Sequence, residues 1–318
     1  MPPERLPRLA DIEAAAEQIS GVASRTPLTE SPALSRRFGI TVYLKLECFQ
    51  PIRVFKIRGA YNKISQISAK KIVAASSGNH GIAVAYSSRM LGKQCTVVVP
   101  EAAVKEKLDV IQEYGSDVVK FGKYHSDREM KAREIASQTG ATFVPPFNDR
   151  DIIAGQGTCG LEIAQQLEDF ESVIVPVGGG GLISGISIAI KSLKPSARVY
   201  GVEPTGAAKM QASLSAGKIV TIAEPKSIAD GLIPASVGEL TLEACQKNVD
   251  GMFSVTDDEI LSSMKLLIHQ AHIFAEPSGS APLAVLSKVE KSSKLGGRVV
   301  LVISGGNVSL SLLDRLLS

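Results

Sequence analysis

Short apolar runs alternate with longer amphipathic segments along this chain, which predicts buried strands covered by helices. Several runs are apolar at every position, as in strands that are covered on both faces of a parallel sheet. We predict strands at Val42–Glu47, Ile72–Ala75, Cys95–Val99, Asp117–Phe121, Val173–Val177, Val199–Val202 and Val299–Ile303. Helical spacing predicts helices at Ala102–Gln112, Asp127–Thr139, Asp151–Leu167 and Asp257–Gln270, the last behind a capping box that starts at Thr256. This alternation indicates an α/β fold with two open, twisted sheets.

Composition narrows the class of protein. The 318 residues are 44% hydrophobic and 21% charged, which is ordinary for a globular protein of one large or two medium domains. The net charge of +3 comes without a basic cluster, so we expect no nucleic-acid and no membrane partner. The N-terminus lacks a signal-peptide pattern, and the scattered Cys48, Cys95, Cys159 and Cys245 suggest free thiols rather than a disulfide framework or a zinc site. A cytoplasmic location is therefore expected.

Lys56 is the candidate catalytic residue. It follows Phe55 in a segment that begins as a strand and ends as a helix. A lysine between apolar neighbours at such a junction can lose its hydration, which lowers its pKa and gives the neutral amine that Schiff-base chemistry requires. Taken alone, the pattern is more typical of a surface lysine whose stem covers apolar neighbours, and the other segments of the chain reverse this interpretation.

The polar segment Ser76-Ser77-Gly78-Asn79-His80-Gly81 follows the predicted strand Ile72–Ala75 and precedes a helical run. Hydroxyls, an amide and backbone N–H groups at a helix N-terminus can receive an anion, and we expect a carboxylate here. An ordinary helix cap is the alternative, but one cap residue would suffice for that. For His80, an acid-base role is the alternative, but a lone histidine in a turn more often serves as a hydrogen-bonding residue.

The run Gly178-Gly179-Gly180-Gly181-Leu182 follows the predicted strand Val173–Val177. Glycines allow a phosphate to approach the backbone amides closely, and the dipole of the following helix adds attraction. The run fits neither a nucleotide P-loop nor the dinucleotide fingerprint, so the phosphate should belong to another kind of molecule. A flexible hinge is the alternative.

Two more polar segments, Glu276–Ser280 and Ser304–Asn307, complete the candidate chemistry, although each could be a plain loop. Together, a lysine, a phosphate-binding loop, a carboxylate-binding loop and a strand-end hydroxyl suggest pyridoxal 5′-phosphate as cofactor.

The chain resembles the fold-type II pyridoxal-phosphate family of serine/threonine dehydratases and serine racemases from about Ile12 to Leu312. The matching stretches, in chain order, are Arg25–Leu28, Phe55–Ala60, Ser76–Gly81, Ile153–Thr158, Gly178–Leu182, Gly201–Pro204, Ala229–Gly231, Glu276–Pro277 and Ser304–Asn307. This resemblance implies a large cofactor-binding domain of residues 1–70 and 149–318. It also implies a small mobile domain of residues 71–148 that closes on the substrate.

The same resemblance assigns roles to individual residues. Lys56 would be the Schiff-base lysine, Phe55 would pack on the pyridine ring, and Asn79 would bond the 3′ oxygen. Ser304 would face the ring nitrogen, and Glu276 would belong to the cofactor site. The phosphate would be bound by Gly178, Gly179, Gly180, Gly181 and Leu182. The substrate carboxylate would be received by Ser76, Ser77, Gly78, Asn79 and His80.

The implied reaction is α,β-elimination of L-threonine or L-serine to 2-oxobutyrate or pyruvate with release of ammonia. The alternative is a serine racemase with side dehydratase activity, in which Ser77 would be the second acid-base group; the motifs do not separate the two. A non-catalytic sensor conflicts with the intact Lys56, and no second-substrate site for a β-replacing synthase is evident. A homodimer is expected from the resemblance. Because the chain ends soon after Asn307, inhibition by isoleucine is not expected.

Three positions depart from the family pattern. Ile52-Arg53-Val54 stands where a triplet ending in Ser is usual, and Ile82 stands where many members have a polar residue. Members with a divalent-cation site use a glutamate, a backbone carbonyl and a second carboxylate. Here Glu203 and the Ala207 carbonyl fit, but Lys209 occupies the last position. An ammonium group repels a dication at that range, so we predict no metal there, with the Lys209 charge as its substitute.

Overall fold

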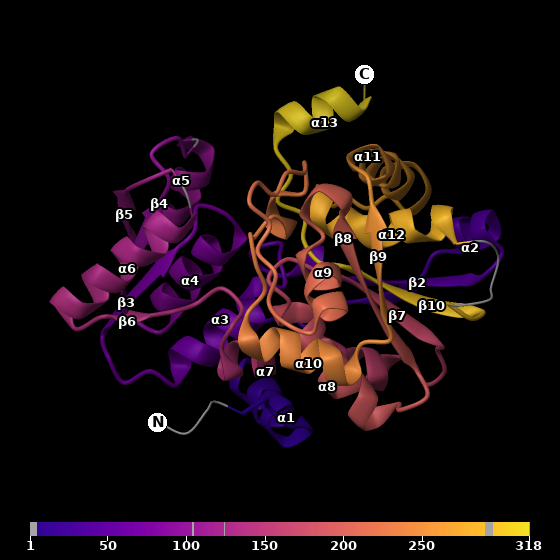
Figure 1. Ribbon diagram of the computed structural model, residues 1–318, viewed down its shortest axis with the longest axis horizontal. Coiled ribbons are helices and arrows are strands. Elements are labelled where there is room, and N and C mark those ends of the chain that lie inside the picture. Colours follow the sequence, from indigo (N-terminus) through magenta and orange to yellow (C-terminus); the bar gives the residue numbers. More distant parts are fainter. Residues whose placement is uncertain (1–4, 104, 124, 290–294, 318) are drawn as a thin grey trace.

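Two sheets of unequal size organise the chain (Figure 1). The computed structural model describes residues 5–103, 105–123, 125–289 and 295–317. In the view of Figure 1 the smaller sheet and its helices lie to the left and the larger sheet to the right. The expectation of two α/β sheets is thereby confirmed.

The larger sheet has six strands in the order β1-β2-β10-β7-β8-β9. Its strands are β1 (Leu28–Glu30), β2 (Thr41–Leu46), β7 (Ser172–Pro176), β8 (Arg198–Pro204), β9 (Gly251–Val255) and β10 (Arg298–Ile303). All neighbours run parallel except β1, which pairs with β2 antiparallel. Residues of β7 alternate between two cores: Ile174 belongs to one, and Val173 and Val175 to the other. A strand covered on both faces must be apolar throughout, as its sequence is.

The smaller sheet has four parallel strands in the order β5-β4-β3-β6. Its strands are β3 (Lys71–Ala75), β4 (Gln94–Val99), β5 (Asp117–Lys120) and β6 (Thr142–Phe143). Here too, Ile72 and Ala74 join one core while Val73 and Ala75 join another. These strands all lie within residues 71–148; the domain boundaries and the mobility of the smaller unit stay predictions.

Helices cover both faces of each sheet (Figure 1). The α-helices are α1 (Leu9–Gln18), α2 (Pro32–Phe38), α3 (Lys56–Ser65), α4 (Asn79–Met90), α5 (Lys105–Glu113), α6 (His125–Thr139), α7 (Arg150–Gln166), α8 (Gly181–Leu193), α9 (Lys209–Ala216), α10 (Glu239–Asn248), α11 (Asp257–Leu266), α12 (Pro277–Lys288) and α13 (Leu310–Leu317). Short 3-10 turns span Glu47–Phe49, Thr205–Ala207 and Asp230–Leu232, and a π-turn spans Leu267–Ala271. One core of the larger sheet is built with α12, and the other with α7 and α8. No helix among the described residues is long and apolar enough to cross a bilayer.

The predicted strands are confirmed to within one or two residues at each end, whereas β1, β6 and β9 were not predicted. The predicted helix over Ala102–Gln112 begins at Lys105 instead, beyond residue 104, which lies outside the described part. The predicted helix over Asp257–Gln270 starts as expected, since Thr256 Oγ1 accepts from the Glu259 amide and the Glu259 carboxylate accepts from the Thr256 amide. Its α-helical part ends at Leu266, where the backbone changes to the π-turn.

Candidate active site

The functional segments meet beside the carboxyl ends of β3, β7 and β10, where open α/β sheets bind ligands. Lys56 is the first residue of α3, and Phe55 immediately before it donates its backbone N–H to the Ser304 carbonyl at 3.1 Å. Val54 is fully buried and forms an isolated β-bridge with Gly305. The lysine segment is thus joined to the strand-end hydroxyl segment, although about 250 residues separate them.

The Lys56 ammonium makes a polar contact with the segment that follows β6: Nζ donates to the Pro146 carbonyl at 2.7 Å. Nζ also lies 5.3 Å from the centroid of the Phe55 ring. Burial lowers the pKa of Lys56 to about 8, because the ammonium loses its hydration. The amine is therefore neutral far more often at neutral pH than an ordinary lysine, as covalent catalysis through an imine requires.

An amide-carboxylate chain connects the smaller sheet to the larger one at the site. Asn79, the first residue of α4, donates from Nδ2 to Glu276 Oε1 at 2.8 Å. Asn307 donates to Asn79 Oδ1 at 2.8 Å and to the Ile52 carbonyl at 3.2 Å. Glu276 precedes α12, and its amide donates to the Gly305 carbonyl at 3.0 Å. Asn79, Glu276 and Asn307 are therefore held in one place by three distant parts of the chain.

The segment Ser76–Gly81 forms the turn between β3 and α4. Gly78 donates its backbone N–H to Ser76 Oγ at 3.2 Å, and Ser76 to Asn79 are half-buried. Gly81 has to be glycine, since a Cβ there would stand 2.0 Å from the Ser76 carbonyl oxygen. His80 is buried, with Nε2 at 3.0 Å from the Val144 carbonyl. This contact favours the hydrogen-bonding role for His80 over an acid-base role.

The glycine loop Gly178–Gly181 connects β7 to α8, whose first residue is Gly181. Gly180 has φ +95°, which favours glycine. A Cβ at Gly178 would stand 2.6 Å from the Gly231 carbonyl, and one at Gly179 would stand 2.1 Å from the Phe147 ring. Protein groups thus occupy the space where side chains would project, while the first amides of α8 have no partner within the helix. This is the donor set and shape that a phosphate group needs, so the residues present fit pyridoxal 5′-phosphate.

Sequence reasoning missed several residues that shape this site. Pro146 and Phe147 lie between the smaller sheet and α7 and contact Lys56 and the glycine loop. Thr241 donates from Oγ1 to the Gly179 carbonyl at 2.8 Å. Asn307 lies in the polar segment Ser304–Asn307, but the sequence suggested no role for it. Only its position three residues after Ser304 could have drawn attention to it, because its contacts lie far away in the sequence.

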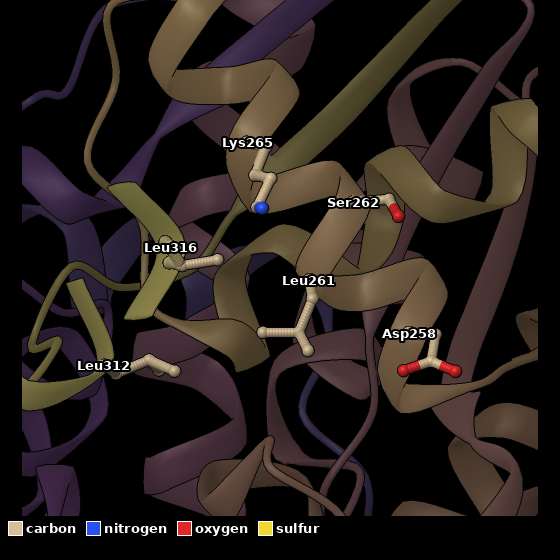
Figure 2. A pocket seen from close by; sticks show the side chains of 6 residues that line it. All are labelled: Asp258, Leu261, Ser262, Lys265, Leu312 and Leu316. Carbon is tan, nitrogen blue, oxygen red and sulfur yellow. The ribbon is translucent and has the colours of Figure 1, made fainter. Parts of the chain in front are cut away.

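The surface crevice shown in Figure 2 is separate from this site. It measures about 240 Å³ and lies between α11 and α13. Its lining consists of Asp258, Leu261, Ser262, Lys265, Leu312 and Leu316. None of these residues belongs to the segments described above, and both of its charged residues, Asp258 and Lys265, are exposed to solvent. We assign no chemistry to it.

Comparison with known proteins identifies the class. The family described as "Pyridoxal-phosphate dependent enzyme" matches residues 19–305, and the chain belongs to this family. It is a fold-type II enzyme that uses pyridoxal 5′-phosphate.

Individual relatives are similar over nearly the whole chain. The L-threonine ammonia-lyase of Thermotoga maritima is 41% identical, over 98% of this chain and 78% of the relative. The serine racemase of Dictyostelium discoideum is 39% identical over 100% of both chains. Among solved structures, maize serine racemase aligns with a TM-score of 0.93 at 34% identity, covering 98% of this chain and 96% of that one. The processed form of threonine deaminase isoform 2 from Solanum lycopersicum aligns with a TM-score of 0.90 at 36% identity, covering 97% of this chain and 91% of that one.

Proposed function

We propose that this enzyme is an ammonia-lyase that converts L-threonine to 2-oxobutyrate, or L-serine to pyruvate, and releases ammonia. The observation that carries this proposal is the Lys56 amine at the start of α3, which donates to the Pro146 carbonyl at 2.7 Å and whose pKa is lowered to about 8 by burial. The similarity to L-threonine ammonia-lyase over 98% of the chain supports the same activity.

Each segment has a task in this proposal. The hydroxyls and amides of Ser76–His80 bind the substrate carboxylate, and the glycine loop with the N-terminus of α8 binds the cofactor phosphate. Bound pyridoxal 5′-phosphate supplies an electron sink for the negative charge that develops at the substrate Cα. Lys56 Nζ, in its neutral form, would take the α-proton. The β-hydroxyl would then leave with a proton as water, and addition of water to the unsaturated amine would give the keto acid and ammonia.

Ser304 bears on what happens after the proton is removed. It is 2% exposed and directly follows β10, at the position that the resemblance places beside the ring nitrogen. A hydroxyl does not enforce protonation of that nitrogen as a carboxylate would. The charge on the substrate is then less deeply delocalised, which favours loss of the β-hydroxyl over transamination.

A panel of β-hydroxy amino acids tests the proposal. L-threonine, L-serine, their D-enantiomers and L-threo-3-hydroxyaspartate are each incubated with the cofactor-loaded enzyme, and keto acid, ammonia and product chirality are measured together. We expect equal amounts of keto acid and ammonia from L-threonine or L-serine, and neither from the Lys56→Ala variant. If no member of the panel gives keto acid above that variant, the proposal is wrong.

Serine racemisation is the second candidate, favoured by the 39% identity to a serine racemase. Ser77 is half-buried in the turn before α4. In a two-base reaction its hydroxyl would return a proton to Cα after Lys56 has removed one. The Ser77→Ala variant separates the activities when D-serine and pyruvate are measured side by side. Loss of D-serine with pyruvate retained supports a two-base racemase, whereas parallel loss of both products contradicts it. Ser137→Ala, at an exposed position on α6, is the matched control.

Three further features belong to the proposal. The smaller unit, residues 71–148, closes over the substrate through the turn Ser76–Gly81. The enzyme is a homodimer, for which the exposed aromatic rings of Phe49 (53%) and Phe274 (55%) offer apolar contact area. It works in the cytoplasm, where its four buried, free cysteines would stay reduced. Light scattering of the purified protein tests the oligomeric state.

A further inference from the structure

A fully buried ion pair lies behind the glycine loop, outside the reacting groups. Lys209 is the first residue of α9, and neither its side chain nor that of Glu203 has any exposed surface. Its ammonium is surrounded by four oxygens. These are Glu203 Oε1, the Ala207 carbonyl and the Leu232 carbonyl, each at 2.9 Å, and the Val177 carbonyl at 3.3 Å.

The carboxylate partner is held as firmly as the ammonium. Glu203 lies at the end of β8, and its two oxygens accept the backbone N–H groups of Met210 and Gln211, each at 2.9 Å. These are amides of the first turn of α9, whose N–H groups lack partners within the helix. One positive and one negative charge thus share a dry site in which each has several hydrogen bonds, as buried charges require.

The carbonyls around the ammonium belong to segments that flank the glycine loop. Val177 directly precedes Gly178. Leu232 follows Gly231, whose carbonyl lies 2.6 Å from where a Cβ of Gly178 would be. Lys209 therefore ties the start of the loop to the turn that packs against it.

The four oxygens around the Lys209 ammonium form a cage that is suited to a cation rather than to a neutral amine. Its four oxygens are all acceptors, and a neutral amine would direct its lone pair at one of them. Within the described residues, no group of three His, Cys, Asp or Glu side chains is placed to hold a metal ion. The expected absence of a divalent ion here stays a prediction.

We propose that Lys209 is a built-in cation whose ammonium holds the glycine loop in its phosphate-binding shape, so that the chain binds its cofactor without any dissolved metal ion. Lys209 is a positioning residue in this scheme, because its ammonium contacts the Val177 and Leu232 carbonyls and would act on cofactor binding through them. The inference rests on the cofactor that the family uses and goes beyond the proposed reaction.

The test measures cofactor affinity, followed by the absorbance of bound pyridoxal 5′-phosphate, in the absence of any substrate. Wild type, Lys209→Ala and Lys209→Met are compared in choline chloride, ammonium chloride, potassium chloride and magnesium chloride at equal ionic strength, with and without a chelator. Lys218→Met, an exposed lysine just beyond α9, is the matched control. Since no substrate is present, the result does not depend on whether the enzyme proves to be a lyase.

We expect wild type and the control to bind cofactor equally well in all salts. Both Lys209 variants should bind it at least about tenfold more weakly, because several hydrogen bonds to a charged group are lost. Ammonium and potassium ions should restore binding to Lys209→Ala, which leaves a cage with one negative charge and room for a monovalent ion. They should not restore it to Lys209→Met, whose side chain fills the cage, and Mg²⁺ should help neither, since it demands octahedral coordination.

Either of two results would overturn the inference: wild type loses its cofactor when metal ions are removed, or both Lys209 variants bind it as tightly as wild type. Circular dichroism checks that each variant is folded. If the Lys209 variants do not fold, Glu203→Gln serves instead, because it keeps the shape of the pair and removes the counter-charge. Weaker cofactor binding by folded Glu203→Gln supports the inference, and unchanged affinity contradicts it.

Discussion

The lowered pKa of Lys56 predicts how fast cofactor-free enzyme captures pyridoxal 5′-phosphate at each pH. With a pKa of about 8, roughly one Lys56 amine in ten is neutral at pH 7. At the ordinary lysine value of 10.5, only roughly one in three thousand would be. Burial therefore raises the reactive fraction by roughly 300-fold. The perturbation needed is a change of pH alone.

The assay follows the absorbance change when the cofactor is mixed with cofactor-free protein over a series of pH values. The capture rate should rise about tenfold per pH unit on the acid side and level off above about pH 8. A model lysine peptide under the same conditions is the control, since it removes the titration of the cofactor itself from the comparison. A rate that keeps rising in parallel with the peptide to pH 10 or beyond would show that Lys56 is not desolvated.

The same shift has a consequence for stability, with a definite sign. Between about pH 8 and 10.5 the unfolded chain keeps a proton on Lys56 that the folded, cofactor-free chain has released. This group therefore makes the folded state more stable as the pH rises through that window. At neutral pH, where Lys56 is mostly protonated in both states, its burial lowers the free energy of unfolding by about 3 kcal/mol.

Two other substitutions test the packing and charge arguments. Gly179→Ala would place a Cβ 2.1 Å from the Phe147 ring, so we expect loss of bound cofactor by absorbance, while Gly251→Ala, with its nearest neighbour at 3.5 Å, should keep it; equal cofactor content in both would contradict the packing argument. Glu47→Gln leaves the fully buried Arg58 guanidinium without a carboxylate that it contacts at 2.7 and 2.8 Å, which should cost about 3 to 5 kcal/mol in urea unfolding. A cost below about 1 kcal/mol would show that the rest of the network compensates. Arg58 holds the pKa of Glu47 down at about 2, against the effect of burial. In the wild type, the stabilisation of the folded state by the Glu47–Arg58 pair is therefore fully present above about pH 4.5 and is lost as the pH falls through about 2.

The strands that could be predicted are those whose sequence follows from burial on both faces. Val173–Val177 and Val299–Ile303 are apolar at every position, since helices cover both sides of β7 and β10. β1 and β9 escaped prediction for the opposite reason. β1 is a short edge strand in which Thr29 and Glu30 are polar and exposed, and β9 is a half-buried edge strand that begins with glycine. β6 has only two residues, too few for any periodicity.

In the candidate site, too, only the features that a local sequence pattern encodes could be predicted. Lys56, the turn Ser76–Gly81 and the glycine loop are local motifs, and their positions at strand ends follow from the order of elements. Contacts between distant segments could not be predicted. The Asn307–Asn79 hydrogen bond joins residues 228 positions apart, and the Lys56–Pro146 bond joins residues 90 apart. Such pairings depend on how the two sheets pack together, which no local pattern encodes.

Borohydride reduction of the cofactor-loaded enzyme, followed by peptide mass spectrometry, tests the central claim most directly. The account predicts that the reduced cofactor is attached to the peptide that carries Lys56, at that residue alone. Cofactor found on another lysine, or no covalent attachment in a protein that binds pyridoxal 5′-phosphate, would contradict it.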